Sequence, residues 1–189
     1  MKKGYTLAET LITLAIIGVI AGLLFPVMQK NTPNREMLAF KKAYSSVERA
    51  IAEMINDEAM YSEGEGFADT RGVIYEGKTY RGETKFCGLL AAKLGATCDD
   101  NGTFQTGDGM IWTVQEADFE NGEESMITVD VDGEQGENAY EDTATKIADR
   151  FGIFVGRYAN IHAGSSENSI ERIYINEDDT TRTFKELKK

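Results

Sequence analysis

Hydrophobic and polar residues divide the chain into three stretches with different patterns. The first is an apolar run from Leu11 to Met28, 18 residues without a charged side chain. As a helix, this run covers roughly 27 Å, which is enough to cross the hydrocarbon core of a bilayer. Two lysines precede it and an acidic chain follows it, which places the N-terminus in the cytoplasm. The pattern therefore predicts a single membrane-spanning helix.

The second stretch is amphipathic. From Pro33 onward, apolar residues recur at steps of three and four, and most charged residues lie elsewhere. This period predicts a helix of about six turns. Its apolar face is expected to pack on a sheet. A coiled-coil dimer seam is the secondary alternative, because the run is barely three heptads long. The positions that define this face are Met37, Phe40, Tyr44, Val47, Ile51 and Met54.

The third stretch, residues 58–189, alternates short apolar segments with turns. A hairpin is expected over residues 72–80, a short helix over 86–94, and strands over 109–114 and 125–131. One long helix packed on a small antiparallel sheet corresponds to an α+β fold, with the N-terminal helix spanning the membrane in its first half and amphipathic in its second.

Three further expectations concern the end of the chain. Asp149–Gly152 has the composition of a tight turn between two strand-like segments. Tyr174 and Ile175 suggest a late edge strand. Residues 184–189, with the sequence FKELKK, are most simply a solvated tail.

Composition narrows the possible functions. The chain has 189 residues and a net charge of −12, distributed as +2 over residues 1–33 and −14 over residues 58–189. Such an acidic domain is not expected to bind nucleic acid through its field. One histidine, His162, and two cysteines exclude His-rich metal sites and zinc ribbons. A third possible function is an enzyme of the cell envelope that is held by a signal anchor. The sequence contains no G-x-S-x-G, P-loop or HExxH motif, so it offers no active-site residues for such an enzyme.

Glu9 is the unusual residue of the N-terminal segment. A carboxylate at the edge of a membrane helix is costly without a partner, so it suggests a functional site, with a boundary acid as the alternative. An ordinary secretory signal fits poorly, because the apolar run is long and no small-x-small cleavage site ends it.

Lys2-Lys3-Gly4, followed by Tyr5-Thr6-Leu7-Ala8-Glu9 and the apolar run, resembles the class III signal of type IV pilins and type II secretion pseudopilins. The resemblance implies that a prepilin peptidase cuts between Gly4 and Tyr5 and methylates the new N-terminus at Tyr5. Glu9 would then be the fifth mature residue, which is the position of the family's assembly glutamate. Tyr5 and Ala8 differ from the residues that are commoner in the family, but neither difference removes the features expected for cleavage.

Three residues within the apolar run suggest local distortion of the helix. Gly18 and Gly22 form a GxxxG pattern, which by itself also fits close helix packing. Pro26 lies where the family has its helix-distorting proline. Together they indicate a stretch that can lose helix hydrogen bonds, a property that the resemblance implies for the assembled filament.

The resemblance implies a non-enzymatic structural subunit of a type IV filament, most similar to a type II secretion pseudopilus. Its partners would be copies of itself, other pilins or pseudopilins, prepilin peptidase, the inner-membrane assembly platform and the membrane, and no nucleic acid. The alternative is a type IV pilus subunit or a minor tip pilin that binds DNA, a substrate or a surface. The presence of Glu9 favours a position in the body of the filament.

This interpretation divides the chain into a leader (residues 1–4), a transmembrane assembly helix (5–28), its amphipathic continuation (29–57) and a soluble acidic domain (58–189). The protein would cross the bacterial inner membrane once, with the domain in the periplasm or outside the cell.

Two cysteines lie close together in the acidic domain. In an oxidising compartment, Cys87 and Cys98 favour a structural disulfide that stabilises the fold by roughly 2–3 kcal/mol. Two buried free thiols or a redox pair are the alternatives, although the spacing is not CxxC.

Residues 130–142 are rich in carboxylates, amides and glycines. They resemble a stretch after the central strand of pseudopilins, several of which bind calcium nearby. Asp130, Asp132, Asn138 and Asp142 are the candidate ligands, because oxygen donors suit Ca²⁺. The alternative is a solvated turn with side-chain-to-backbone hydrogen bonds. No cofactor is required, and Ca²⁺ is the one candidate.

Overall fold

The structure is a computed structural model. It describes residues 7–30, 35–133, 135–136, 138–140, 148–166 and 169–176, with the side chains of the first range described for residues 8–20. The elements are, in chain order, α1 (Leu7–Lys30), α2 (Arg35–Ile55), η1 (Gly66–Ala68), β1 (Val73–Tyr75), β2 (Lys78–Tyr80), α3 (Lys85–Lys93), β3 (Thr103–Gln105), β4 (Ile111–Val114), η2 (Phe119–Asn121), β5 (Ser125–Asp130), β6 (Arg150–Val155), β7 (Ile161–Ala163) and α4 (Ile170–Asn176).

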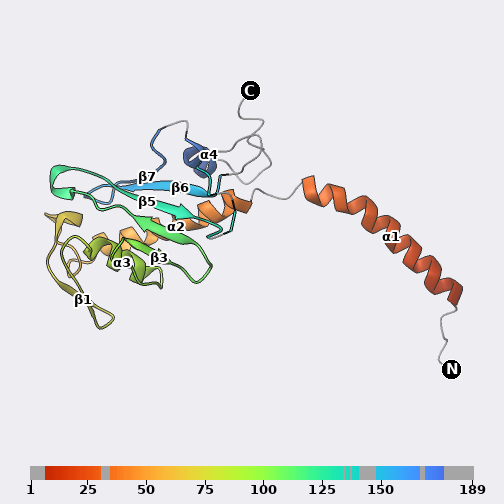
Figure 1. The fold of residues 1–189 in the computed structure, drawn as a ribbon, viewed down its shortest axis with the longest axis horizontal. Helices are drawn as coiled ribbons and strands as arrows, with labels where there is room; N and C mark the ends of the chain where they lie inside the picture. Colours follow the sequence, from red (N-terminus) through yellow and green to blue (C-terminus); the bar gives the residue numbers. More distant parts are fainter. Residues whose placement is uncertain are drawn as a thin grey trace.

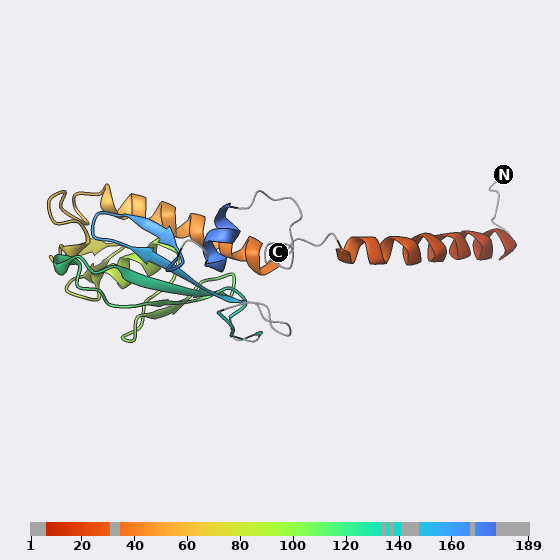
Figure 2. The same cartoon turned by 90° about the horizontal axis from the view of Figure 1, so that it is seen from above.

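Helix α1 contains the predicted apolar run. In both views it stands apart from the other elements (Figures 1 and 2). Its described side chains, residues 8–20, are all exposed. Among the residues that the structure describes, no helix is both long and apolar enough to qualify as a membrane span.

Helix α2 confirms the predicted amphipathic pattern. Its buried residues lie on one face, against the five-stranded sheet (Figure 2). Phe40, with no exposed surface, stacks on Phe151 of β6 with ring centroids 4.6 Å apart. This contact joins the helix to the sheet. The buried residues of α2 are Met37, Phe40, Ala43, Val47, Ala50, Ile51 and Met54.

The main sheet has the strand order β3-β4-β5-β6-β7, and every neighbouring pair is antiparallel. Strand β5 is central and pairs with β6 over six positions, from Ser125 opposite Val155 to Asp130 opposite Arg150. Alternate residues of β5 and β6, including Ile127 and Ile153, are fully buried. The sheet and α2 therefore share one hydrophobic core, and the α+β prediction is confirmed.

The hairpin and the short helix also follow the prediction. Strands β1 and β2 pair antiparallel around Glu76 and Gly77, which both have positive φ, the backbone geometry of a tight hairpin turn. Helix α3 ends at Lys93, and Gly95 follows with a φ of +75°. Glycine adopts this left-handed conformation without steric cost, so it ends the helix.

Two local predictions are wrong. Asp149–Gly152 is not a turn, because β6 begins at Arg150 and pairs with β5, where the Arg150 guanidinium reaches Asp130. Tyr174 and Ile175 belong to helix α4 and not to an edge strand. Tyr174 is buried with its ring against Phe151, so packing overrides the strand preference of these residues. Strands β3 and β7, of three residues each, were not predicted.

Candidate functional site

The N-terminal candidate residues belong to α1 or precede it. Glu9 lies in the first turn of the helix, and Gly4 and Tyr5 fall outside the described residues. Large apolar side chains on α1 are between 51% and 65% exposed: Leu11, Ile12, Leu14, Ile16, Ile17, Val19 and Ile20. Helix α1 thus presents a continuous apolar surface next to a carboxylate, and such surfaces mark sites of contact with lipid or protein.

Gly18, Gly22 and Pro26 all lie within the bounds of α1, which is one helix from Leu7 to Lys30. A Cβ placed on Gly18 would meet no heavy atom within 4 Å. The distortion predicted for these residues concerns the assembled state, and it stays a prediction.

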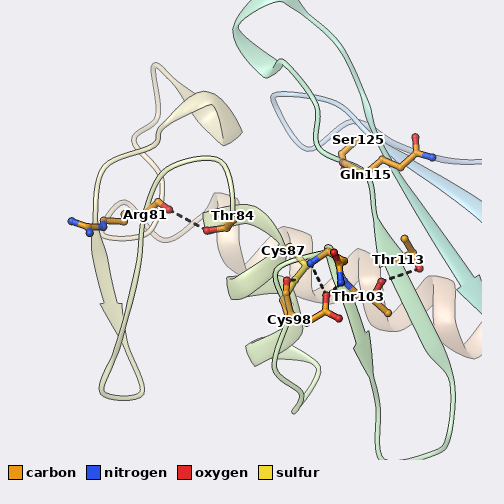
Figure 3. Close-up of a disulfide and its surroundings, with 10 residues drawn as sticks. Arg81, Thr84, Cys87, Cys98, Thr103, Thr113, Gln115 and Ser125 are labelled. Atoms are coloured by element: carbon orange, nitrogen blue, oxygen red, sulfur yellow. Dashed lines mark hydrogen bonds between the residues drawn. A yellow bond between two sulfur atoms is a disulfide. The ribbon is translucent and has the colours of Figure 1, made fainter.

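Cys87 of α3 and Cys98 of the loop before β3 form a disulfide (Figure 3). Their Cα atoms are 6.0 Å apart, and Cys87 is buried. In the same loop, the Asp99 carboxylate accepts hydrogen bonds from the backbone of Asn101 and Thr103. The disulfide therefore fixes α3 to the start of the sheet.

The predicted calcium segment leads from the end of β5 to the start of β6. Asp130 is buried, and its Oδ2 accepts a hydrogen bond from Arg150 Nε at 2.9 Å. The same guanidinium donates to Asn138 Oδ1. Asp149, which sequence analysis did not select, is also buried and accepts hydrogen bonds from the backbone N–H groups of Asn138 and Ala139. The structure thus brings Asp130 and Asn138 together through an arginine.

Asp132 lies in the same cluster and carries the clearest electrostatic perturbation. Burial, followed by the nearby carboxylates of Asp149 and Asp130, raises the pKa of Asp132 to about 6. A Cβ on Gly136 would clash with the carboxylates of Asp132 and Asp149, so only glycine permits this close approach. Among the described residues, Asp130 Oδ1 and Asp132 Oδ1 are buried and have no hydrogen-bond donor.

Two further facts bear on the calcium prediction. Asp142 lies outside the described residues. Within the described part of the chain, no group of three or more His, Cys, Asp or Glu side chains is arranged to hold a metal ion.

A second buried ionic cluster was missed by sequence analysis. Lys85 is 2% exposed, and its Nζ donates to the backbone carbonyl of Asp69 at 2.8 Å and lies 4.3 Å from the centroid of the Tyr61 ring. The Asp69 carboxylate, also buried, accepts two hydrogen bonds from the Arg71 side chain. These bonds, opposed by burial, hold the pKa of Asp69 well below its ordinary value. Only the tertiary fold brings Lys85 and Tyr61 to Asp69, so no spacing in the sequence reveals this buried group.

His162 has a structural environment. Its Nε2 lies 3.1 Å from Glu124 Oε2, its Nδ1 lies 3.1 Å from the carbonyl oxygen of Gly164, and its ring stacks on Phe154. These contacts connect β7 and β6 to the segment before β5, and they place no nucleophile beside the imidazole.

Residues 1–25 match the family model described as the prokaryotic N-terminal methylation motif. This motif is the class III prepilin signal of type IV pilins and pseudopilins, so the resemblance based on Lys2–Glu9 is confirmed. Proteins with this motif are structural subunits that are anchored in the cell envelope, processed by prepilin peptidase and assembled into filaments. No curated protein and no solved structure matches the chain.

Proposed function

We propose that the protein is a structural subunit of a type IV filament of the type II secretion pseudopilus kind and that it has no catalytic activity. Prepilin peptidase would cut between Gly4 and Tyr5 and methylate Tyr5. The observation that carries this proposal is the methylation motif over residues 1–25, which includes most of helix α1 and its exposed apolar side chains.

The division into leader, assembly helix, amphipathic continuation and acidic domain is part of the same proposal. Residues 5–28 would cross the inner membrane, with residues 58–189 on the far side. The charge difference between the lysines at residues 2 and 3 and the acidic domain supports this orientation.

Glu9 would direct assembly through its charge. Cleavage leaves a positive amine at Tyr5 in or near hydrocarbon, where an unpaired charge is strongly penalised. The Glu9 carboxylate of a neighbouring subunit neutralises this amine, and the low dielectric makes the pairing far stronger than at a surface. The pair would therefore select one axial register between subunits. Gly18, Gly22 and Pro26 would then let the packed helix extend.

The test is Glu9→Ala in cells that express the chain with its assembly machinery. The variant should still be cleaved and methylated, as measured by N-terminal sequencing and mass analysis, but it should be absent from sheared filaments. Glu36→Ala, on the first turn of α2, is the matched control and should assemble normally. Normal assembly of Glu9→Ala, or a mature protein that still begins at Met1, would contradict the proposal.

We also propose that the cluster at the β5–β6 connection binds Ca²⁺. Asp132 lies near the carboxylates of Asp130 and Asp149, and Asp130 also pairs with the Arg150 guanidinium. Asp130 Oδ1 and Asp132 Oδ1 lack a donor among the described residues. Asn138 fits poorly as a ligand because Arg150 occupies its side-chain oxygen. The described carboxylates alone do not form a group of three that could hold a metal ion, so the proposed site needs Asp130 and Asp132 together with Asp142, which lies outside the described residues.

Calcium titration of the full-length chain in detergent tests this site. A ligand at 100 times its Kd stabilises a fold by about 2.7 kcal/mol, so the melting temperature should rise at millimolar Ca²⁺. Asp132→Asn should abolish the rise, whereas Asp108→Asn, at a surface ion pair with Lys42, should preserve it. An unchanged melting temperature of the wild type would contradict the proposed calcium site.

A further inference from the structure

A groove of about 780 Å³ opens at the end of the domain that lies away from α1 and α4. It is lined by η1, the loop before α3, the end of β4 and η2. Its volume falls within the range of about 300–1,000 Å³ that is typical of ligand pockets. We call it the distal groove. Part of this region is seen in Figure 3, between Thr84 and Cys87 on one side and Gln115 on the other. Its apolar lining includes Phe67, Phe86, Val114, Ala117 and Phe119.

The charged lining of the distal groove is almost entirely acidic. Lys85 is the one basic lining residue, and its ammonium group is held by the Asp69 carbonyl. Glu83 and Glu116 lie so close that the first raises the pKa of the second. A groove with an apolar floor, formed by residues that are largely buried beneath it, and an anionic rim suits a segment that carries both lysines and large apolar side chains. The acidic lining residues are Glu83, Asp99, Asp100, Glu116, Asp118 and Glu120.

The chain itself contains such a segment after α4. Residues 182–189 have the sequence RTFKELKK, with four basic residues and one acidic residue. Phe184 and Leu187 are three positions apart, and Lys185 and Lys188 share that spacing. This segment lies beyond the described residues, which end at Asn176. It is the most basic stretch of the acidic part of the chain, so its charge is complementary to that of the groove.

Geometry favours the groove of a second molecule over the segment's own. Helix α4 packs near the start of α2, where Tyr174 contacts Phe151 and Phe151 contacts Phe40. The groove lies beyond the other end of α2, and the stretch from Phe40 to Ile55 alone spans about 22 Å at 1.5 Å per residue. Phe184 follows Asn176 by eight residues, which reach at most about 29 Å when fully extended. The distance along α2 alone takes up most of that length and leaves little for the path across the domain, so the groove of a second copy is easier to reach.

We infer that the distal groove receives residues 182–189 of a second copy of this chain. Phe184 and Leu187 contact the apolar floor of the groove, and the lysines pair with the carboxylates of Glu83, Glu116 and their neighbours. The contact joins opposite ends of two domains, so it is heterologous, and a heterologous contact that does not close into a ring builds a filament. The inference rests on the proposed filament function, because stacking along a filament brings these two ends together.

Photo-crosslinking of the full-length chain tests the inference. We would place p-benzoylphenylalanine at position 184 and mix ¹⁵N-labelled with unlabelled subunits before irradiation. The expected products join position 184 to residues 82–87 or 113–120 of a chain with the other label. The same probe at Ile74, which is 75% exposed and outside the groove lining, should give none of these products. Products that map within one chain, elsewhere on the domain or to another protein, or no products, would overturn the inference.

Charge reversal tests whether the lysines of the segment pair with the carboxylates of the groove. Lys185→Glu with Lys188→Glu should lower the yield of the crosslink about tenfold, and so should Glu83→Lys with Glu116→Lys. The four substitutions together should restore it. Glu58→Lys, on the domain surface outside the lining, is the matched control and should leave the yield unchanged. Failure of the combined variant to recover the crosslink would count against the pairing, since Glu83 and Glu116 are exposed and their replacement leaves the core intact.

Filament formation is measured on the same samples by sedimentation and electron microscopy. Filaments without the crosslink would refute the inference and leave the proposed function standing. If no filaments form, the proposed function fails, and the crosslink between detergent-solubilised chains then decides the inference by itself.

Discussion

Helices α1 and α2 follow one another in the chain, yet their apolar side chains differ in exposure to solvent. The described apolar side chains of α1 are exposed, whereas those of α2 lie on one face that the sheet covers. An amphipathic helix can bury its apolar stripe within its own domain, but a helix that is apolar all around needs a partner on every side. Helix α2 therefore completes the fold, and the apolar surface of α1 is left for lipid or neighbouring subunits, as proposed above.

Because α1 and α2 differ in this way, substitutions in the two helices should affect different properties. The free energy of unfolding should depend on α2 and its core, and assembly should depend on α1. Trp112 is buried and is the only tryptophan, so its fluorescence in the full-length chain reports unfolding of the domain alone.

The largest expected effect is at Phe40. Phe40→Ala removes a fully buried ring that stacks on Phe151, which should cost about 3–5 kcal/mol through lost burial and the remaining cavity. Urea unfolding followed by Trp112 fluorescence measures the loss. Leu38→Ala on the same helix is the control, because Leu38 is 37% exposed, and it should cost much less. Equal losses at both positions would show that α2 is not held by this face.

Asp69→Asn should follow with a loss of about 3 kcal/mol at neutral pH, because it leaves Lys85 buried without its carboxylate partner. The Arg71 hydrogen bonds lower the pKa of Asp69 in the folded state. The stability that this group contributes is therefore present above its unfolded pKa of about 3.9 and is lost as the pH falls below that value.

Unfolding curves at pH 7, 5 and 3 test this dependence. The difference between wild type and Asp69→Asn should be constant from pH 7 to 5 and smaller at pH 3. Asp108→Asn, at an exposed pair with Lys42, provides the control and should change stability by less than about 1 kcal/mol. A difference that grows on acidification would contradict the assigned direction of the pKa shift.

Removal of the disulfide should have a smaller effect. Replacing Cys87 and Cys98 together by alanine should lower stability by about 2–3 kcal/mol, since a short loop loses its covalent closure in the unfolded state. Reduction of the wild type should give a similar loss in the same unfolding assay. A reductant-insensitive wild type with all thiols accessible to alkylation would show that the bridge does not form.

The smallest effect on unfolding is expected in α1. Ile17→Ala should change the domain's free energy of unfolding by less than about 0.5 kcal/mol, because Ile17 is 62% exposed in the isolated chain. The same substitution made at Ile51 of α2, which is 2% exposed, serves as the contrast and should cost about 2–5 kcal/mol. A large loss at Ile17 would mean that α1 packs on the domain, and the comparison would fail.

Local patterns predicted several elements well. The apolar face of α2 and the central strand β5 follow from the spacing of apolar residues, and the β1–β2 hairpin follows from the turn residues Glu76 and Gly77. The segments near Asp149 and Tyr174 were misassigned because their conformation depends on distant partners. Asp130 fixes the start of β6, and Phe151 draws Tyr174 into the core.

The same contrast holds for the candidate sites. The N-terminal motif consists of neighbouring residues, so Gly4, Tyr5 and Glu9 could be selected from the sequence. They lie within residues 1–25, which the family model matches, and their individual roles stay predictions. The segment at Asp130 and Asp132 was found from its composition, but the parts played by Asp149 and Arg150 were not.

The sequence alone determined the prepilin-type signal, the apolar helix that follows it and the face of α2 that is buried, because each depends on residues close together along the chain. Only the tertiary structure placed Lys85 beside Asp69 and an acidic groove at the far end of the domain. It also showed that Arg150 donates hydrogen bonds to Asp130 and Asn138, two of the predicted calcium ligands. Those features arise from long-range packing and desolvation, which bring distant charges together and which local sequence patterns do not record.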